Sequence, residues 1–345
     1  MITISDLENI DSEKMYKIYD QWPEIADKSF NSELEVIDFG KIDHIVFSGM
    51  GGSGTIGDFF AAILSKTNLH VNVVKGYVLP KNVNSETLVI TTSVSGNTEE
   101  TLSVLESAHK MNCKILAFAS GGKMEEFCYN NNIKFCKIKK YHSPRASFVS
   151  YFYSILKIIE PNIPVKNSEI KKSLQELKDT RKTISSENLS DTNEALNIAN
   201  FLDSVPIIYY PWGLQAAAIR FKSSLQENSK MHTMVEDIVE ASHNGIVAWE
   251  VKSSIQPILL QGKDDYIKTK ERWKIIEKYF NQNQIKFQKI ISKEGDIITK
   301  LINLIYILDY ASIYLAVKNG VNPTPVKSID FIKNQLKNSK EPFEN

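Results

Sequence analysis

The sequence predicts an α/β fold of two units, each a mainly parallel β-sheet flanked by helices in an αβα sandwich, joined by a helical linker. At about 150 residues per domain, 345 residues are enough for a little over two domains. Short apolar runs rich in β-branched residues alternate with helix-like stretches, and this alternation occurs twice along the chain. Strands separated by helices indicate a parallel sheet that is covered on both faces.

The first unit is expected to span residues 37–160, after an N-terminal helical segment over 1–36 that Pro23 interrupts. Its strands are expected at 42–47, 71–74, 87–92, 114–119 and 133–138, and its helices at 55–66, 97–112 and 122–131. Each strand is short and apolar, and each helical stretch follows a turn, as in a repeated strand–helix unit.

A polar stretch rich in Lys, Glu, Ser and Asn, residues 161–203, is expected to form a helical linker on the surface. The second unit, 204–322, repeats the first in outline. Its strands are expected at 205–210, 231–238, 257–260 and 285–291, and its helices at 213–226, 266–282 and 295–317. The remaining residues, 323–345, should form a short helix over 326–336, with a proline near its start, and a tail.

Composition excludes several classes of protein. The 41 Lys and Arg residues balance 41 Asp and Glu residues, so no basic excess is available to bind nucleic acid or an acidic membrane. No apolar run approaches the roughly 18 residues that a membrane span needs, and the N-terminus lacks the basic and apolar regions of a secretory signal. We therefore expect a soluble, cytoplasmic protein. Three cysteines without C-x-x-C spacing argue against a disulfide framework and a thiolate metal site.

The first predicted strand runs into a glycine turn, GMGGSG at 49–54, which opens a helix. Such a turn at the mouth of a parallel sheet binds anions, because free N–H groups and the positive end of the helix face the ligand. The spacing also satisfies the dinucleotide pattern G-x-G-x-x-G. Between Asp58 and Glu86, however, there is no acid to bind the ribose, although Lys75 could meet a 2′-phosphate. A dinucleotide-dependent enzyme remains an alternative.

The third predicted strand ends in a second hydroxyl-rich turn, TTSVSGNTEET at 91–101. Here Ser93, Ser95 and Thr98 can donate hydrogen bonds, while free amides and the start of the next helix supply the rest of a monophosphate site. The alternative is that these hydroxyl groups only cap that helix. Two such turns at adjacent strand ends of one sheet favour the phosphate site.

These two turns resemble those of the sugar isomerase (SIS) domain superfamily. Four later segments resemble one branch of it, the bifunctional phosphoglucose/phosphomannose isomerase family: SPRAS at 143–147, LQENSK at 225–230, SHNGIVAWE at 242–250 and IDFIK at 329–333. The similarity covers nearly the whole chain beyond residue 40. One departure is Val94, where the family often has an aromatic residue between the two serines.

The resemblance implies a role for individual residues. The phosphate of the substrate would be bound by Gly52, Ser53, Ser93, Ser95 and Thr98. Glu227 would be the base that moves a proton between C1 and C2, and Arg145 would stabilise the enediolate. His243 and Lys333 would open the sugar ring. The family works as a homodimer, in which His243 would reach into the site of the neighbouring subunit.

The chemistry agrees with these roles. A carboxylate can take a proton from one carbon and return it to the next, and a fixed guanidinium offsets the charge that develops on oxygen. A histidine that titrates near neutrality suits ring opening. No step requires a metal ion or another cofactor. From the residues alone, Glu227 could be a solvated helix residue, Arg145 a helix start, His243 a turn residue and Lys333 a surface lysine.

The sequence thus predicts a cofactor-free aldose–ketose isomerase of hexose 6-phosphates, which joins glucose 6-phosphate and fructose 6-phosphate, with mannose 6-phosphate as a second aldose. Thr324 is a candidate for tolerance of both configurations at C2. A phosphosugar-binding sensor without catalysis is an alternative from another class. An aminosugar isomerase is a third reading, which would need an ammonia-supplying domain that this chain lacks.

Overall fold

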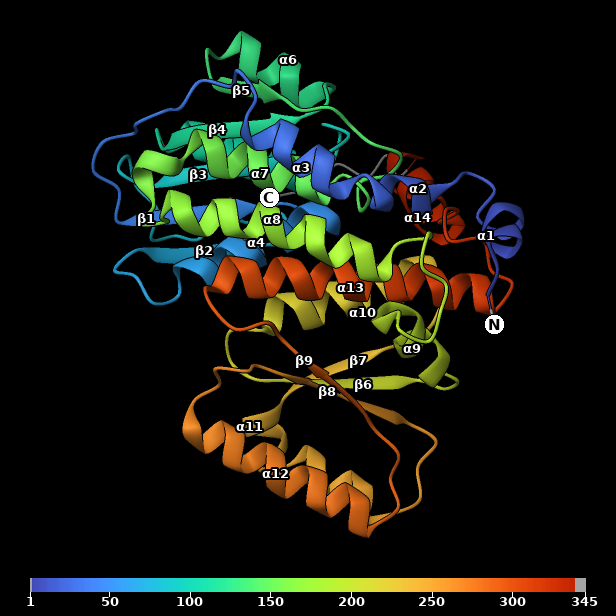
Figure 1. Cartoon of the computed structure of the whole chain (residues 1–345). Coiled ribbons are helices and arrows are strands. Elements are labelled where there is room, and N and C mark those ends of the chain that lie inside the picture. Colours follow the sequence, from blue (N-terminus) through green and yellow to red (C-terminus); the bar gives the residue numbers. More distant parts are fainter. Residues whose placement is uncertain (1, 339–345) are drawn as a thin grey trace.

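The computed structural model describes residues 2–338 and contains two parallel β-sheets, with helices packed on the faces of both (Figure 1). The predicted fold class is confirmed. A single apolar core runs between the two sheets and includes side chains from both of them. The two sheets are therefore joined through shared packing as well as through the chain.

The first sheet has the strand order β2-β1-β3-β4-β5, and all of its strand pairs are parallel. Its strands are β1 (His44–Ser48), β2 (His70–Val74), β3 (Leu88–Ser93), β4 (Lys114–Ala119) and β5 (Lys134–Lys137). The chain leaves β1 toward β2 on one side and then crosses back to β3 on the other. The carboxyl ends of β1 and β3 therefore form a topological switch point, which is where open α/β sheets bind ligands.

The second sheet has the order β7-β6-β8-β9 and is also parallel throughout. Its strands are β6 (Pro206–Tyr210), β7 (Met234–Asp237), β8 (Gln256–Gln261) and β9 (Gln288–Ile291). Two of these strands begin three residues later than predicted. In both cases a residue with positive φ, Lys230 or Gln284, directly precedes the predicted start, and the three residues that follow it lie outside the parallel pairing, which begins at Met234 and Gln288.

Helices cover both faces of each sheet. The helices up to the end of the first sheet are α1 (Ile4–Ile10), α2 (Met15–Asp20), α3 (Trp22–Phe30), α4 (Gly52–Leu64), α5 (Glu99–Lys110), α6 (Lys123–Asn130) and α7 (Phe148–Ile158). The later ones are α8 (Asn167–Ile184), α9 (Glu194–Phe201), α10 (Gln215–Asn228), α11 (Ile238–Ala241), α12 (Ile267–Gln282), α13 (Ile297–Lys318) and α14 (Lys327–Asn338), with 3₁₀ turns η1 (Glu160–Asn162) and η2 (Gly245–Glu250).

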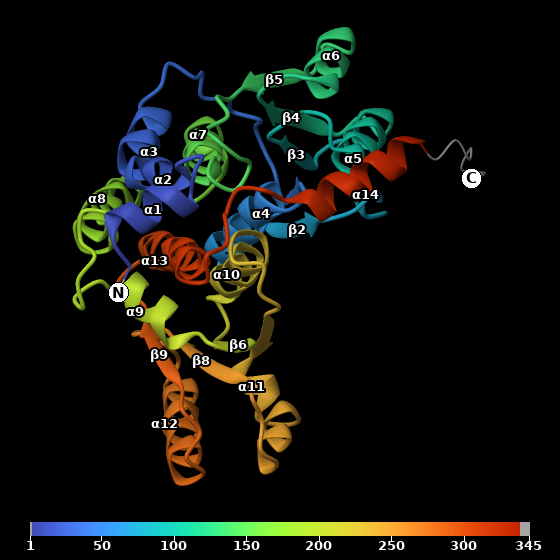
Figure 2. The same cartoon turned by 90° about the vertical axis from the view of Figure 1, so that its right-hand side faces the viewer.

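Helix α13 lies between the two sheets (Figures 1 and 2) and packs against α8, α9 and α10. It is long and apolar enough to cross a membrane, but 94% of its apolar stretch is buried inside the protein. A helix that is apolar all round is expected in such a position. Buried tyrosines fix it, because Tyr306 donates to the carbonyl of Tyr19 at 2.6 Å and Tyr314 to that of Ile184 at 2.7 Å.

Two details of the helices follow only from the structure. The polar stretch expected on the surface contains α8, whose inner face is fully buried at Ile170, Leu177 and Ile184. Polar residues predominate in α8 because only a stripe of the helix meets the core. Pro23 does not interrupt a helix but lies in the first turn of α3, where the missing N–H has no helical partner to lose.

Candidate functional site

The glycine turn 49–54 closely contacts the end of β3. A Cβ atom added to Gly49 would lie 2.9 Å from Ser53 and 2.9 Å from the carbonyl oxygen of Thr92. No side chain larger than hydrogen fits there. The turn after β1, which contains the buried Ser53, therefore lies directly beside the turn that follows β3 and begins with Ser93.

The second turn is held in a bent conformation by its own hydroxyl groups. The Ser93 and Thr98 hydroxyl oxygens are 2.8 Å apart, and the Ser93 hydroxyl accepts a hydrogen bond from the Gly96 amide at 3.1 Å. The exposed Ser95 hydroxyl accepts from the Asn97 amide at 3.3 Å. Gly96 has φ of +70°, and a Cβ there would lie 1.6 Å from the carbonyl oxygen of Gly121.

The helices that follow both turns begin without a side-chain cap. Thr98 occupies the N-cap position of α5 but makes no capping hydrogen bond, and the same is true of Gly51 at the start of α4. The alternative in which Thr98 serves only to cap its helix is therefore wrong. Because α4 has 13 residues and α5 has 12, both helices are long enough to present a partial positive charge to an anion.

Arg145 lies next to the glycine turn. A Cβ atom added to Gly52 would be 3.3 Å from the Cα of Arg145 and 3.3 Å from the carbonyl oxygen of Pro144. The Arg145 side chain is only 4% exposed and reaches into the end of α10. The segment 143–147 thus joins the glycine turn of the first sheet to the second half of the molecule.

Four hydrogen bonds fix the Arg145 guanidinium. Nε donates to the Asn228 side chain at 2.6 Å, Nη1 to the Glu227 carboxylate at 3.1 Å, and Nη2 to the carbonyls of Pro323 and Thr324 at 2.8 and 3.0 Å. A guanidinium has five N–H groups. Within residues 2–338, one N–H on Nη1 has no protein acceptor, and it lies beside the carboxylate of Glu227.

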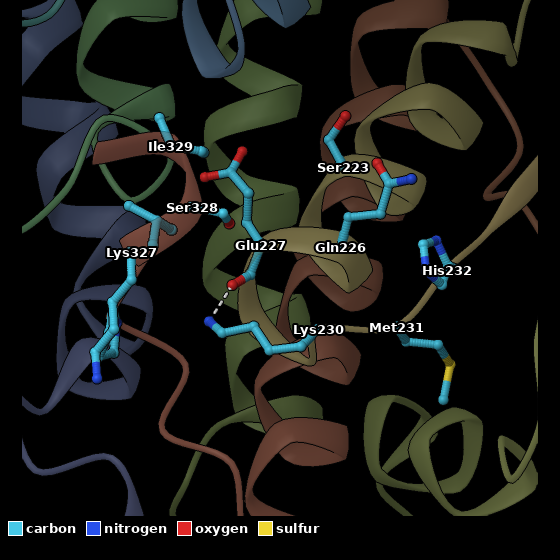
Figure 3. A pocket seen from close by; sticks show the side chains of 11 residues that line it. Ser223, Gln226, Glu227, Lys230, Met231, His232, Lys327, Ser328 and Ile329 are labelled. Atoms are coloured by element: carbon cyan, nitrogen blue, oxygen red, sulfur yellow. Dashed lines mark hydrogen bonds between the residues drawn. The ribbon is translucent and has the colours of Figure 1, made fainter. Parts of the chain in front are cut away.

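Glu227 projects from the last turn of α10 into a cavity of about 760 Å³ (Figure 3). The cavity is lined by Ser223, Gln226, Glu227, Lys230, Met231, His232, Pro325, Val326, Lys327, Ser328 and Ile329. Its size suits a small-molecule ligand. Figure 3 shows the Glu227 carboxylate directed toward Ile329 and away from Lys230. With 24% of its side chain exposed, Glu227 is both held by Arg145 and accessible.

Lys230 and His232, which the sequence motifs did not mark as site residues, also line this cavity. Lys230 donates to the backbone carbonyl of Glu227 at 2.5 Å and to that of Pro323 at 3.3 Å. Partial burial and the charge of Arg145 lower the pKa of Lys230 to about 8. The sequence feature that could have identified Lys230 is the segment LQENSK, in which Lys230 follows Glu227 by three residues.

His243 and Lys333 lie outside the cavity of their own chain. The exposed His243 follows β7 and α11 and therefore lies at the carboxyl edge of the second sheet, whereas Glu227 lies at the amino edge, at the far end of α10. A helix of 14 residues is about 21 Å long. Lys333 is exposed on α14 (Figure 2), and the α14 residues that line the cavity are Lys327, Ser328 and Ile329 (Figure 3).

Other candidate groups are engaged elsewhere. Lys75 was a candidate to bind the 2′-phosphate of a dinucleotide. Its ammonium group lies 2.5 Å from the carboxylate of Asp58, which balances its charge. The Thr324 hydroxyl is 3.5 Å from the Nε2 atom of His142, and its carbonyl accepts from Arg145. Within residues 2–338, no group of three or more His, Cys, Asp or Glu side chains is arranged to hold a metal ion.

The close approach of Gly96 to Gly121 yields a test of the second turn. Gly96→Ala should lower the free energy of unfolding by more than about 2 kcal/mol, because the new Cβ requires a backbone shift and a strained positive φ. Gly76→Ala is the matched control, since nothing lies within 4 Å of its Cβ position, and it should change stability by no more than about 0.5 kcal/mol. Urea denaturation of both variants measures the difference, and equal stabilities would contradict the packing described.

Two family models match the chain, the SIS domain over residues 39–156 and the bacterial phospho-glucose isomerase C-terminal SIS domain over 191–336. The fold is similar to that of tagatose-6-phosphate ketose/aldose isomerase from Escherichia coli, with a TM-score of 0.68 at 15% identity over 92% of this chain and 95% of the other.

Curated relatives match over almost the full length. The bifunctional phosphoglucose/phosphomannose isomerase of Aquifex aeolicus is 28% identical, covering 94% of this chain and 99% of the relative. That of Caldicellulosiruptor bescii is 33% identical over 313 residues, covering 87% of this chain and 91% of the relative. With these matches and with the two SIS-type sheets, the chain belongs to the bifunctional phosphoglucose/phosphomannose isomerase family.

Proposed function

We propose that the protein is an aldose–ketose isomerase of hexose 6-phosphates, which interconverts fructose 6-phosphate with glucose 6-phosphate and with mannose 6-phosphate through a cis-enediol. The observation that carries this proposal is the Glu227 carboxylate, 3.1 Å from the buried guanidinium of Arg145 and open to a cavity of about 760 Å³. The names of the family's curated members support the same reaction.

The substrate phosphate binds where the two turns of the first sheet meet. The side chains and amides that hold it are those of Gly52, Ser53, Ser93, Ser95 and Thr98. Support comes from the contact between the turns at the switch point and from the uncapped starts of α4 and α5, whose free N–H groups attract anions. Neutral donors suffice for such a site, since the turns carry no Lys or Arg.

Glu227 then transfers the proton between the two carbon atoms. As general base it removes the proton from C2 of the open-chain aldose and returns it to C1, while a hydroxyl proton passes from O2 to O1, which yields the ketose. The negative charge that develops on the enediolate oxygen is stabilised by the one N–H of Arg145 that has no acceptor within residues 2–338. Because the other four N–H groups of Arg145 are already bonded, its position needs no reorganisation during the reaction.

Ring opening requires a group that moves a proton at the ring oxygen, and His243 is the candidate. The position of His243 at the opposite edge of its own second sheet supports a homodimer in which this side chain completes the site of the partner. Lys333 on α14 assists the same step. Together these assignments require that two chains share each active site.

A phosphosugar-binding module without catalysis is the second candidate. It is favoured by one observation, that neither His243 nor Lys333 lines the cavity of the single chain. Such a module would bind the sugar phosphate and leave it unchanged. Turnover separates the two candidates directly.

The assignment of Glu227 is tested by a coupled assay that follows glucose 6-phosphate formed from fructose 6-phosphate in the presence of EDTA. Glu227→Gln should lower kcat by roughly 10²- to 10⁴-fold, because the amide cannot accept the proton. Binding of fructose 6-phosphate, measured by calorimetry, should stay of the same order. The control is Glu271→Gln on α12, an exposed carboxylate paired with Lys268, which should leave kcat unchanged. An active Glu227→Gln protein would refute the role of this residue, and binding without turnover by the unmodified protein would favour the sensor.

The shared site is tested by mixing two inactive variants, Glu227→Gln and His243→Ala, after dissociation and reassembly. If His243 acts in the partner's site, each hybrid dimer regains one intact site, and roughly a quarter of the unmodified activity should return, since half of the dimers are hybrids. Each variant treated alone is the control. No recovery, although light scattering shows hybrid dimers, would mean that both residues act within one chain.

A further inference from the structure

We propose that Arg220 is a further substrate-binding residue, whose Nη1 group donates to an anionic oxygen of the sugar phosphate at the glycine turn 49–54. This inference rests on the function proposed above and extends the binding site to a residue on α10. It is carried by three features: a buried guanidinium held rigidly on one side, a nitrogen without a protein acceptor on the other, and the glycine turn that this nitrogen faces.

One side of the Arg220 guanidinium is fixed by Asp309 on α13. Nε lies 3.1 Å from both carboxylate oxygens of Asp309, and Nη2 lies 2.6 Å from one of them. Nη2 also donates to the backbone carbonyl of Arg145 at 2.7 Å. Within residues 2–338, Nη1 takes part in none of these hydrogen bonds and in no other.

Further contacts keep the guanidinium from turning. Asp309 is fully buried, and it also accepts hydrogen bonds from Ser224 at 2.5 Å and from Tyr19 at 3.3 Å. Both of its carboxylate oxygens therefore already accept hydrogen bonds. The ring of Phe148 lies 5.1 Å from the guanidinium carbon of Arg220. Burial acts to lower the pKa of Arg220, but the Asp309 carboxylate outweighs it and holds that pKa above its ordinary value, so the group keeps its charge.

The free nitrogen faces the glycine turn. Nη1 lies 3.4 Å from the position that a Cβ of Gly52 would take, so a side chain at this position would meet the guanidinium. Gly52 is the first residue of α4, which begins without a side-chain cap. The same position is 3.3 Å from the Cα of Arg145. The donors of Nη1, the start of α4 and the backbone next to Arg145 therefore meet at one point.

The chemistry of this point selects an anion. Arg220 is only 1% exposed as a residue, and within residues 2–338 its Nη1 is not among the buried atoms that lack a partner, so this end of the guanidinium is open to a ligand that supplies oxygen atoms. The charge of Arg220 is balanced by Asp309, and that of Arg145 by Glu227. Because neither arginine carries an unbalanced charge, the ligand is recognised by hydrogen bonds from fixed donors and by the N-terminal ends of helices. A lysine, which keeps the charge but lacks the fork of donors, cannot replace Arg220.

The direct test is the crystal structure of the unmodified protein with fructose 6-phosphate. Nη1 of Arg220 is expected within hydrogen-bond distance of a ligand oxygen, with N···O no longer than about 3.2 Å. A sugar phosphate held by the glycine turn and beside Glu227, but with no oxygen within about 4 Å of Nη1, would overturn the role of Arg220 and leave the proposed isomerase intact. A ligand bound elsewhere would overturn both.

The energetic test compares Arg220→Lys with Arg181→Lys. The lysine variant of Arg220 retains the charge opposite Asp309 and removes Nη1, so the Kd for fructose 6-phosphate and for inorganic phosphate should rise roughly tenfold to a hundredfold. Arg181→Lys, the matched control, makes the same change in an arginine of α8 that is paired with Glu24 on the surface, so its Kd values should stay within about threefold of the unmodified protein. Unchanged binding by a folded Arg220→Lys protein, or equal losses in both variants, would overturn the proposal. If the lysine variant does not fold, the crystallographic distance decides.

Discussion

The arrangement of the whole site depends on the buried guanidinium of Arg145. Its hydrogen bonds reach the end of α10 through Glu227 and Asn228 and the segment after α13 through Pro323 and Thr324. A charged group that is 4% exposed is tolerated only when its donors are paired, because the unpaired state costs several kcal/mol. Arg145 therefore holds these segments together, and its own backbone packs against Gly52 of the glycine turn.

Two arginine–carboxylate pairs lie near the glycine turn, and their burial separates their roles. Asp309 is completely buried and bonded to Arg220, Ser224 and Tyr19, so its pair with Arg220 is fixed. Glu227 shares one hydrogen bond with Arg145 and remains 24% exposed to a cavity. A carboxylate that must exchange a proton needs access to a ligand, whereas one that orients an arginine needs none. The same chemical pair is thus closed to ligands at one place and open to a cavity at the other.

The shared core explains how two separate sheets hold one site. Helix α13 packs against α8, α9 and α10, and its residues belong to a single apolar core together with the inner faces of both sheets. Glu227 and Asp309 come from helices of this layer, while the glycine turn and the turn after β3 come from the first sheet. Because protein interiors are close-packed, the layer fixes the position of Glu227 relative to these turns.

The sequence alone determined the order of the strands, since apolar periodicity and turn residues are local properties; the strand 114–119 has the predicted bounds, whereas α7 and the short α11 were not predicted. It also determined that two hydroxyl-rich turns follow β1 and β3. Only the tertiary structure decided which distant residues meet. Arg145 and Glu227 are 82 positions apart and Arg220 and Asp309 are 89 apart, and no local pattern predicts that they pair. The same holds for α8, which is polar in composition yet packs one face into the core, and for His243, whose motif matched although its side chain lies far from Glu227. Packing and the need to satisfy buried charge act across the whole chain, so they become readable only once the chain is folded.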